Sequence, residues 1–188
     1  MKYFERLAGF DTLRLILCRK AILVEGPSDE LVVQKAYLKK YKSLPIEDEI
    51  DVISVGMSFL KFLDIAEKIK RPVAVVTDND GDVEALKDKY KDYLGDKKDY
   101  IKICYDEIVD SGELKIGKAK AAFNYNTLEP KLLKSNSLKI LNEIFGTDHS
   151  EIDDMHKYMR GNKADCALKI FDTDKEIQFP QYIIDAIN

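Results

Sequence analysis

The sequence predicts an α/β fold: a Rossmannoid parallel sheet flanked by helices, followed by a C-terminal helical extension. Short apolar runs rich in β-branched residues alternate with helix-length segments over the first half of the chain, which is typical of βαβ units. These runs are apolar almost throughout, as expected for parallel strands covered on both faces. Beyond about residue 127 the apolar residues recur mainly at helical spacing, which predicts the extension.

The first predicted strand spans Lys20–Val24. It ends at the segment from Glu25 to Asp29, where Gly and Pro break the strand and Ser28 or Asp29 can cap a helix. The helix that follows closes near Lys42, because lysines in a last turn complement the helix dipole.

Further strands and helices then alternate. Gly56 turns the chain into a helix with an apolar stripe from Phe59 to Ile69, and a later stripe from Val83 to Leu94 predicts another helix. The other predicted strands are 51–55, 72–77 and 100–104.

We expect three parts along the chain. Residues 1–17 are predicted to be an irregular opening linker, residues 18–126 the α/β core, and residues 127–188 a helical extension packed on that core. The extension is predicted to hold helices around 138–145, 155–159 and 164–171.

Composition restricts the class of protein. The 188 residues are 45% hydrophobic and 34% charged, which suits one globular domain and excludes a disordered tail or a fibrous repeat. The longest apolar runs have four residues, against the ~20 that cross a bilayer, so no membrane span is expected. The N-terminus lacks the apolar core of a secretory signal, which favours the cytoplasm. Three cysteines, widely spaced, are expected to be buried thiols.

Charge is distributed unevenly, although the net charge is only −4. The stretch from Lys115 to Lys139 holds six lysines and one glutamate, whereas Asp78 to Glu84 holds four acids and no base. A basic stretch beside an acidic cluster suits a metal-dependent enzyme that acts on a phosphate polymer. A lysine-rich run is also common on an ordinary solvated helix face.

Acidic side chains follow two of the predicted strands. Glu25 follows the first strand with Asp29 one helical turn further on, and Asp78, Asp80 and Asp82 follow the third. Ligands of open parallel sheets bind beyond the carboxyl ends of the strands, so these acids are candidate site residues. Carboxylates gathered at one edge repel one another unless cations neutralise them, and such hard oxygen ligands suit Mg²⁺ or Mn²⁺.

Each motif also has a simpler interpretation. The Glu25 segment could be a strand end before a capped helix, and the aspartates could be a solvated turn. An EF-hand is excluded because Val83 stands where that loop requires glycine. An aspartyl-phosphate phosphatase would use Asp78 and Asp80, but that chemistry normally places its aspartates on the first strand. His149 and His156 belong to no four-ligand set and are interpreted as structural.

Taken together, the motifs resemble a known domain. Residues 21–30, AILVEGPSDE, and 73–80, VAVVTDND, are similar to the topoisomerase-primase (Toprim) domain, which carries Glu-Gly after its first strand and Asp-x-Asp after its third. Within that superfamily the chain most resembles the C-terminal nuclease region of the overcoming-lysogenization-defect (OLD) family. Segments 14–23, 127–129 and 163–167 add to this resemblance.

The resemblance implies roles for the acidic residues. Glu25 and Asp29 would hold one metal, and Asp78 and Asp80 a second. Asp82 would either ligate metal or cap a helix.

It also implies roles in the extension. Glu129 would add a further carboxylate, or it is simply an acid at a helix N-terminus. Lys163 would stabilise the charge that develops at the scissile phosphate, or it is a surface lysine.

The implied function is a metal-dependent endonuclease that hydrolyses DNA phosphodiester bonds by a two-metal mechanism. The OLD family joins an ATPase domain to its nuclease region, but these 188 residues contain no phosphate-binding loop and hence no ATP site. The chain is therefore either part of a longer protein with an ATPase domain or a stand-alone Toprim protein. A phosphatase or nucleotidyl transferase using the Asp-x-Asp motif and a non-catalytic nucleic-acid docking module remain the alternatives.

Overall fold

The computed structural model describes residues 2–95, 98–112 and 124–188. In these residues, parallel strands form one four-stranded sheet with the order β2-β1-β3-β4, which confirms the predicted fold class. Each strand lies within one residue of its predicted bounds. The strands are β1 (Lys20–Val24), β2 (Ile50–Ser54), β3 (Val73–Val76) and β4 (Ile101–Cys104).

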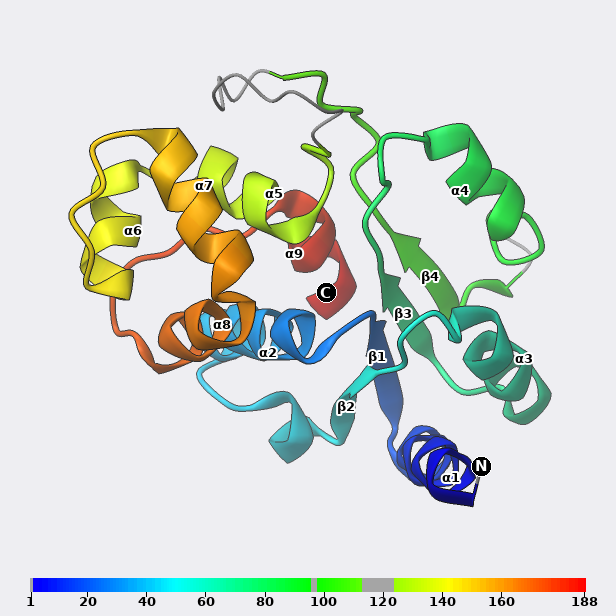
Figure 1. The fold of residues 1–188 in the computed structure, drawn as a ribbon. Helices are drawn as coiled ribbons and strands as arrows, with labels where there is room; N and C mark the ends of the chain where they lie inside the picture. The colour runs from blue at the N-terminus through cyan, green and yellow to red at the C-terminus, as the bar shows by residue number, and fades with distance from the viewer. Residues whose placement is uncertain (1, 96–97, 113–123) are drawn as a thin grey trace.

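Helices cover both faces of the sheet (Figure 1). On one face lies α2 (Pro27–Tyr41), and on the other lie α3 (Phe59–Ile69) and α4 (Val83–Lys89). Alternate strand residues serve separate hydrophobic cores, so that Ile22 packs with the α2 side and Leu23 with the α3 side. This explains why the strands read as unbroken apolar runs, since neither face meets water.

The C-terminal helices join the α2 side of the sheet. α8 packs along α2, and α9 packs on β3 and β4, so these helices share one hydrophobic core with the strands. They are α5 (Leu128–Ser135), α6 (Leu138–Phe145), α7 (Ile152–Gly161), α8 (Lys163–Asp172) and α9 (Gln181–Ile187). A short 3₁₀ turn, η1 (Pro45–Asp48), precedes β2.

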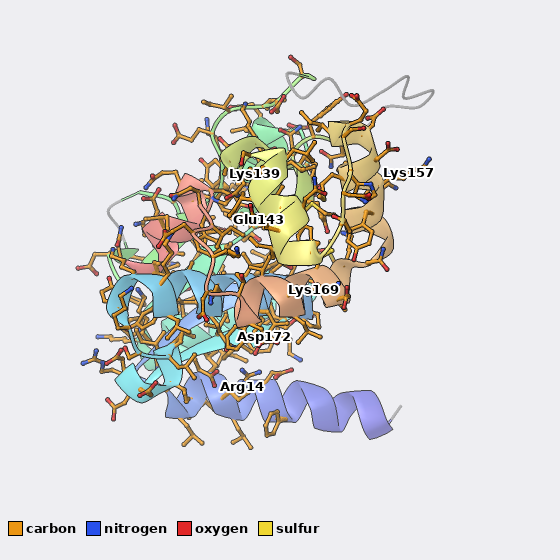
Figure 2. The ribbon with its side chains drawn as sticks, turned by 90° about the vertical axis from the view of Figure 1, so that its left-hand side faces the viewer. Arg14, Lys139, Glu143, Lys157, Lys169 and Asp172 are labelled. Carbon is orange, nitrogen blue, oxygen red and sulfur yellow. The ribbon has the colours of Figure 1, made fainter. Side chains whose placement is uncertain are left out.

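The opening segment is a helix, α1 (Lys2–Leu17), so the predicted irregular conformation is wrong. Leu15 is fully buried, but Phe10 and Leu17 remain exposed, and this mixture conceals the helical period. Arg14 fixes the helix to β2 through hydrogen bonds to Asp51 at 2.8 Å and to the Val52 carbonyl at 2.7 Å. Its side chain points from α1 towards the body of the domain (Figure 2).

Two smaller features complete the fold. α4 ends at Lys89 rather than near Leu94 as predicted, although Leu94 still donates a backbone hydrogen bond to Tyr90. Cys18, Cys104 and Cys166 are buried free thiols, as expected. None of the helices in the described residues is both long and apolar enough to cross a bilayer.

The topology creates a crevice between β1 and β3. The connection after β1 runs through α2 on one face, whereas the connection after β3 runs through α4 on the other. Adjacent strands whose connections leave on opposite faces form a switch point, at which ligands of open α/β sheets bind. The residues that follow β1 and β3 therefore define the candidate site.

Candidate metal centre

The crevice brings together Glu25, Asp29 and Asp78. β1 and β3 are paired with Leu23 opposite Val75, so Glu25 and Asp78 emerge side by side. With Asp29 they line a small pocket of about 10 Å³. Such a volume admits about one water-sized particle.

Asp29 is held by the turn that leaves β1. Its Oδ2 accepts a hydrogen bond of 2.8 Å from the Gly26 amide. A Cβ at Gly26 would lie 3.3 Å from the same oxygen, so glycine permits the close turn. Burial raises the pKa of Asp29 to about 6, assisted by the charges of Glu25 and Glu129 and opposed by the Gly26 hydrogen bond.

The pKa of Asp78 is raised further than that of Asp29. Burial raises its pKa to about 8, and the charges of Asp29, Asp80, Glu129 and Glu25 add to the shift. The buried Tyr182, from α9, donates a hydrogen bond of 3.4 Å to Asp78 Oδ1. Asp78 is thus held in a position where the protein disfavours its negative charge unless a cation is present.

Asn79 shapes the turn after β3. It is buried, and its Nδ2 donates to the carbonyls of Asp106 at 2.6 Å and Ile108 at 3.2 Å, while its Oδ1 accepts from the Gly81 amide. Asp80 follows with a left-handed φ of 48°. Its exposed carboxylate accepts a hydrogen bond of 2.9 Å from Asn124, so a polar loop network positions the second aspartate.

Asp82 acts as a helix cap. Its Oδ1 accepts a hydrogen bond of 2.9 Å from the Ala85 amide at the start of α4. Its carboxylate is exposed and lies at the outer end of the acidic turn. The structure thus shows the cap that the sequence left open for Asp82, and metal ligation by the same carboxylate stays a prediction.

The extension contributes an ion pair. Glu129, near the start of α5, is buried. Its Oε1 lies 2.9 Å from the Nζ of Lys163, which is the first residue of α8. Burial opposes the charge on Lys163, but the hydrogen bond that it donates to Glu129 and the charges of Glu129, Asp29 and Asp78 raise its pKa overall. The ion pair therefore places the Lys163 ammonium close to the carboxylates of the crevice.

The donor set suits a hard divalent cation. The converging groups are carboxylates, whose oxygens are the preferred ligands of Mg²⁺ and Mn²⁺, and the pocket has the size of a single small ion. In the part of the chain that the structure describes, no three acidic, histidine or cysteine side chains meet ligating geometry. The carboxylates surround the pocket and would have to close around a cation.

The basic stretch differs from its predicted role. Lys131 is buried in an ion pair of 2.5 Å with Asp106, and Lys134 pairs with Asp110 at 3.1 Å. Lys139 is exposed on α6 near Glu143 (Figure 2), and Lys115–Lys120 lies outside the described residues. Lys131 is therefore not available to a docking surface, because this buried lysine supports the loop beside Asn79. Docking by the rest of the stretch stays a prediction.

Tyr182, which contacts Asp78, and Lys131, which supports the loop beside the site, were not predicted from the sequence. Tyr182 is one of ten tyrosines and carries no motif, so only the fold reveals it. Lys131 lies in a lysine-rich stretch, a pattern that is common on a solvent-exposed helix face, so its burial could not be predicted. The buried His156 belongs to no metal group in the described residues, and burial lowers its pKa.

Comparisons with known proteins agree with this architecture. Residues 16–80 match the family described as "Overcoming lysogenization defect protein-like, TOPRIM domain", a segment that includes Glu25, Asp29, Asp78 and Asp80. No protein of curated function matches the chain at a significant level.

Solved structures of the C-terminal region of the Xanthomonas campestris pv. campestris OLD protein have a similar fold. The structure phased with platinum has a TM-score of 0.55 at 18% identity, covering 93% of this chain and 92% of that chain. The structure phased with mercury has a TM-score of 0.50 at 18% identity, covering 90% and 93%. These likenesses establish the fold. The resemblance predicted from the sequence is confirmed: residues 16–80 match the OLD-like Toprim family, and the fold is that of the OLD C-terminal region.

Proposed function

We propose that the chain is the nuclease domain of an OLD-like protein and hydrolyses DNA phosphodiester bonds with Mg²⁺ or Mn²⁺. The observation that carries this proposal is the pair of half-buried aspartates, Asp29 and Asp78, whose pKa values are raised at the switch point beside Glu25. The match to an OLD-like Toprim domain supports a metal-dependent, nuclease-type module.

Four carboxylates would hold the cations. Glu25 and Asp29 would ligate one metal, and Asp78 and Asp80 a second. When bound, the cations would supply an activated water and neutralise charge on the departing oxygen. Tyr182 orients Asp78 through its hydrogen bond, and Asn124 fixes Asp80.

Lys163 would act on the substrate. Its side chain is 56% exposed while paired with Glu129, so it can contact a phosphate and remain charged. Such a cation stabilises the charge that develops on the phosphate oxygens in the transition state. Glu129 would then serve mainly to position Lys163 and to contribute negative charge near the cations.

The proposed partners are cytoplasmic DNA and an ATPase domain on a longer chain. The OLD protein whose C-terminal region shares this fold motivates the second partner. An ATPase domain would regulate access to a site that this domain already contains.

The test is incubation of supercoiled plasmid with the purified chain in Mg²⁺, Mn²⁺ or EDTA. We expect nicked or linear product that requires metal and is lost in Glu25→Ala. Glu84→Ala is the matched control, since Glu84 is an exposed acid on α4 that pairs with Lys87. Cleavage that persists in Glu25→Ala would overturn the proposal, and turnover of small phosphate esters alone would favour a phosphatase.

A further inference from the structure

A second, larger pocket lies on the α3 side of the same acidic turn. It is open and has a volume of about 240 Å³, and both Glu25 and Asp80 line it. Its opposite wall is formed by Met57, Phe59, Leu86, Lys89 and Tyr90. The volume is below the ~300–1,000 Å³ of sites that enclose a whole drug-sized ligand, so it suits one unit of a longer ligand.

Lys89 places a positive charge in this otherwise acidic pocket. It is exposed at the end of α4, and its Nζ lies 5.5 Å from the centre of the Phe59 ring and 5.0 Å from that of Tyr90. In the described ranges no carboxylate lies within ion-pair distance of it, whereas Lys87 and Lys91, on either side, pair with Glu84 and Asp88. The rings therefore hold an ammonium whose charge is available to an anion.

Tyr90 gives an independent indication of a missing partner. The residue is fully buried, and its hydroxyl makes no hydrogen bond to any described residue. Thr77 is the nearest polar side chain, and its interaction with the Tyr90 hydroxyl lowers the pKa of Tyr90 against the larger effect of burial, but the Thr77 hydroxyl itself donates to the Asp78 carbonyl. Buried hydroxyls are almost always satisfied, so the Tyr90 hydroxyl on the pocket wall can bond to a polar group that enters the pocket.

Met57 completes an amphipathic wall. Its side chain is 78% exposed at the turn after β2, beside the buried Phe59. An exposed thioether provides an adaptable apolar contact for a flat aromatic group. The pocket thus combines an apolar contact, a free ammonium, an unsatisfied hydroxyl and a rim of metal-type carboxylates.

We propose that this pocket, the Lys89 pocket, binds the nucleotide next to the scissile phosphate. The phosphate of that nucleotide would contact Lys89, and its base would lie against Met57. Movement of Lys89 onto the phosphate would uncover the Tyr90 ring and give its hydroxyl a polar partner. The inference rests on the proposed function, because it assigns the substrate of that site to a nucleic-acid strand.

The test measures binding of a short, fluorescently labelled single-stranded oligonucleotide by anisotropy, in EDTA and in Ca²⁺. We expect Lys89→Glu to weaken binding at least 10-fold, Lys89→Arg to retain it, and Lys91→Glu to change it less than 2-fold. Lys89→Ala should lower the salt dependence by about one phosphate contact. Tyr90→Phe should weaken binding a few-fold without loss of thermal stability.

Three results would overturn the inference: no binding by the wild-type chain in either condition, equal weakening by Lys89→Glu and Lys91→Glu, or unchanged binding in Lys89→Glu. Plasmid cleavage separates this inference from the proposed function. Binding that depends on Lys89 without any metal-dependent cleavage would reject the nuclease alone, whereas cleavage with Lys89-independent binding would reject the pocket alone.

Discussion

The acidic residues of this domain fall into two groups with different surroundings. The inner carboxylates, Asp29, Asp78 and Glu129, lie at the crevice between β1 and β3, where the two aspartates are half-buried and Glu129 is buried. The outer carboxylates, Asp80 and Asp82, lie on the exposed turn before α4. Burial and mutual repulsion raise the pKa values of Asp29 and Asp78, whereas Asp82 is satisfied by a helix amide. Partial burial and mutual repulsion therefore distinguish Asp29 and Asp78 from the exposed carboxylate that caps α4.

The largest expected effect contrasts the two groups directly. Asp78→Asn should reduce metal-dependent plasmid nicking by about 100-fold or more, because it removes a charge that the cations require. Asp82→Asn should change the rate less than about 3-fold, since asparagine caps helices as well as aspartate does. Initial nicking rates measure both, and similar losses in the two variants would contradict the division into inner and outer carboxylates.

The second prediction concerns the buried support of the acidic turn. Lys131→Met should lower the free energy of unfolding by about 3 kcal/mol, at the lower end for broken buried ion pairs, since Asp106 keeps some contact with water. Lys175→Met, which breaks the surface pair with Glu143, should leave the urea midpoint nearly unchanged. Urea denaturation followed by circular dichroism compares them, and equal midpoints would refute the structural role of Lys131.

Bound metal should stabilise the fold, and this stabilisation should depend on the inner carboxylates. At 100 times its Kd, Mg²⁺ should stabilise the wild-type fold by about 2.7 kcal/mol, or roughly 5–10 °C in Tm. In Asp78→Asn the shift should largely disappear, and in Asp82→Asn it should persist. Differential scanning fluorimetry with and without EDTA measures these shifts, and a shift retained in Asp78→Asn would place the ion elsewhere.

The smallest effect comes from a carboxylate far from the crevice. Asp48 accepts hydrogen bonds of 2.8 Å from both Ser43 and Tyr37, which lower its pKa. Its stabilising contribution is therefore complete above the ordinary aspartate pKa of about 3.9 and is lost as the pH falls through the lowered value. The Tm advantage of wild type over Asp48→Asn should shrink between pH 6 and pH 3, and an advantage that grows would contradict the sign.

Much of the site followed from the sequence because strand ends are easy to locate. Glu25 and Asp78 come directly after unbroken apolar runs, and parallel strands deliver their carboxyl ends to one edge. Asp29 follows one helical turn later. The fold class rested on the same runs, which explains why strand bounds were predicted within a residue.

Other features required the three-dimensional structure. Tyr182 reaches Asp78 across 104 residues of sequence, a contact that no local pattern encodes. Aspartate suits both a cap and a ligand, so the role of Asp82 depended on where its oxygen points. α1 was missed because Phe10 and Leu17 are apolar yet exposed, which blurs the helical period.

The central claim is that the carboxylates around the crevice between β1 and β3, with Asp29 and Asp78 at its centre, form a divalent-cation site. Isothermal calorimetry with Mn²⁺ tests it most directly. We predict saturable binding to the wild-type chain, loss of that binding in Asp78→Asn, and retention in Asp82→Asn. Circular dichroism of each variant controls for folding. Absence of Mn²⁺ binding to the wild-type chain, or binding unchanged in Asp78→Asn, would contradict the claim.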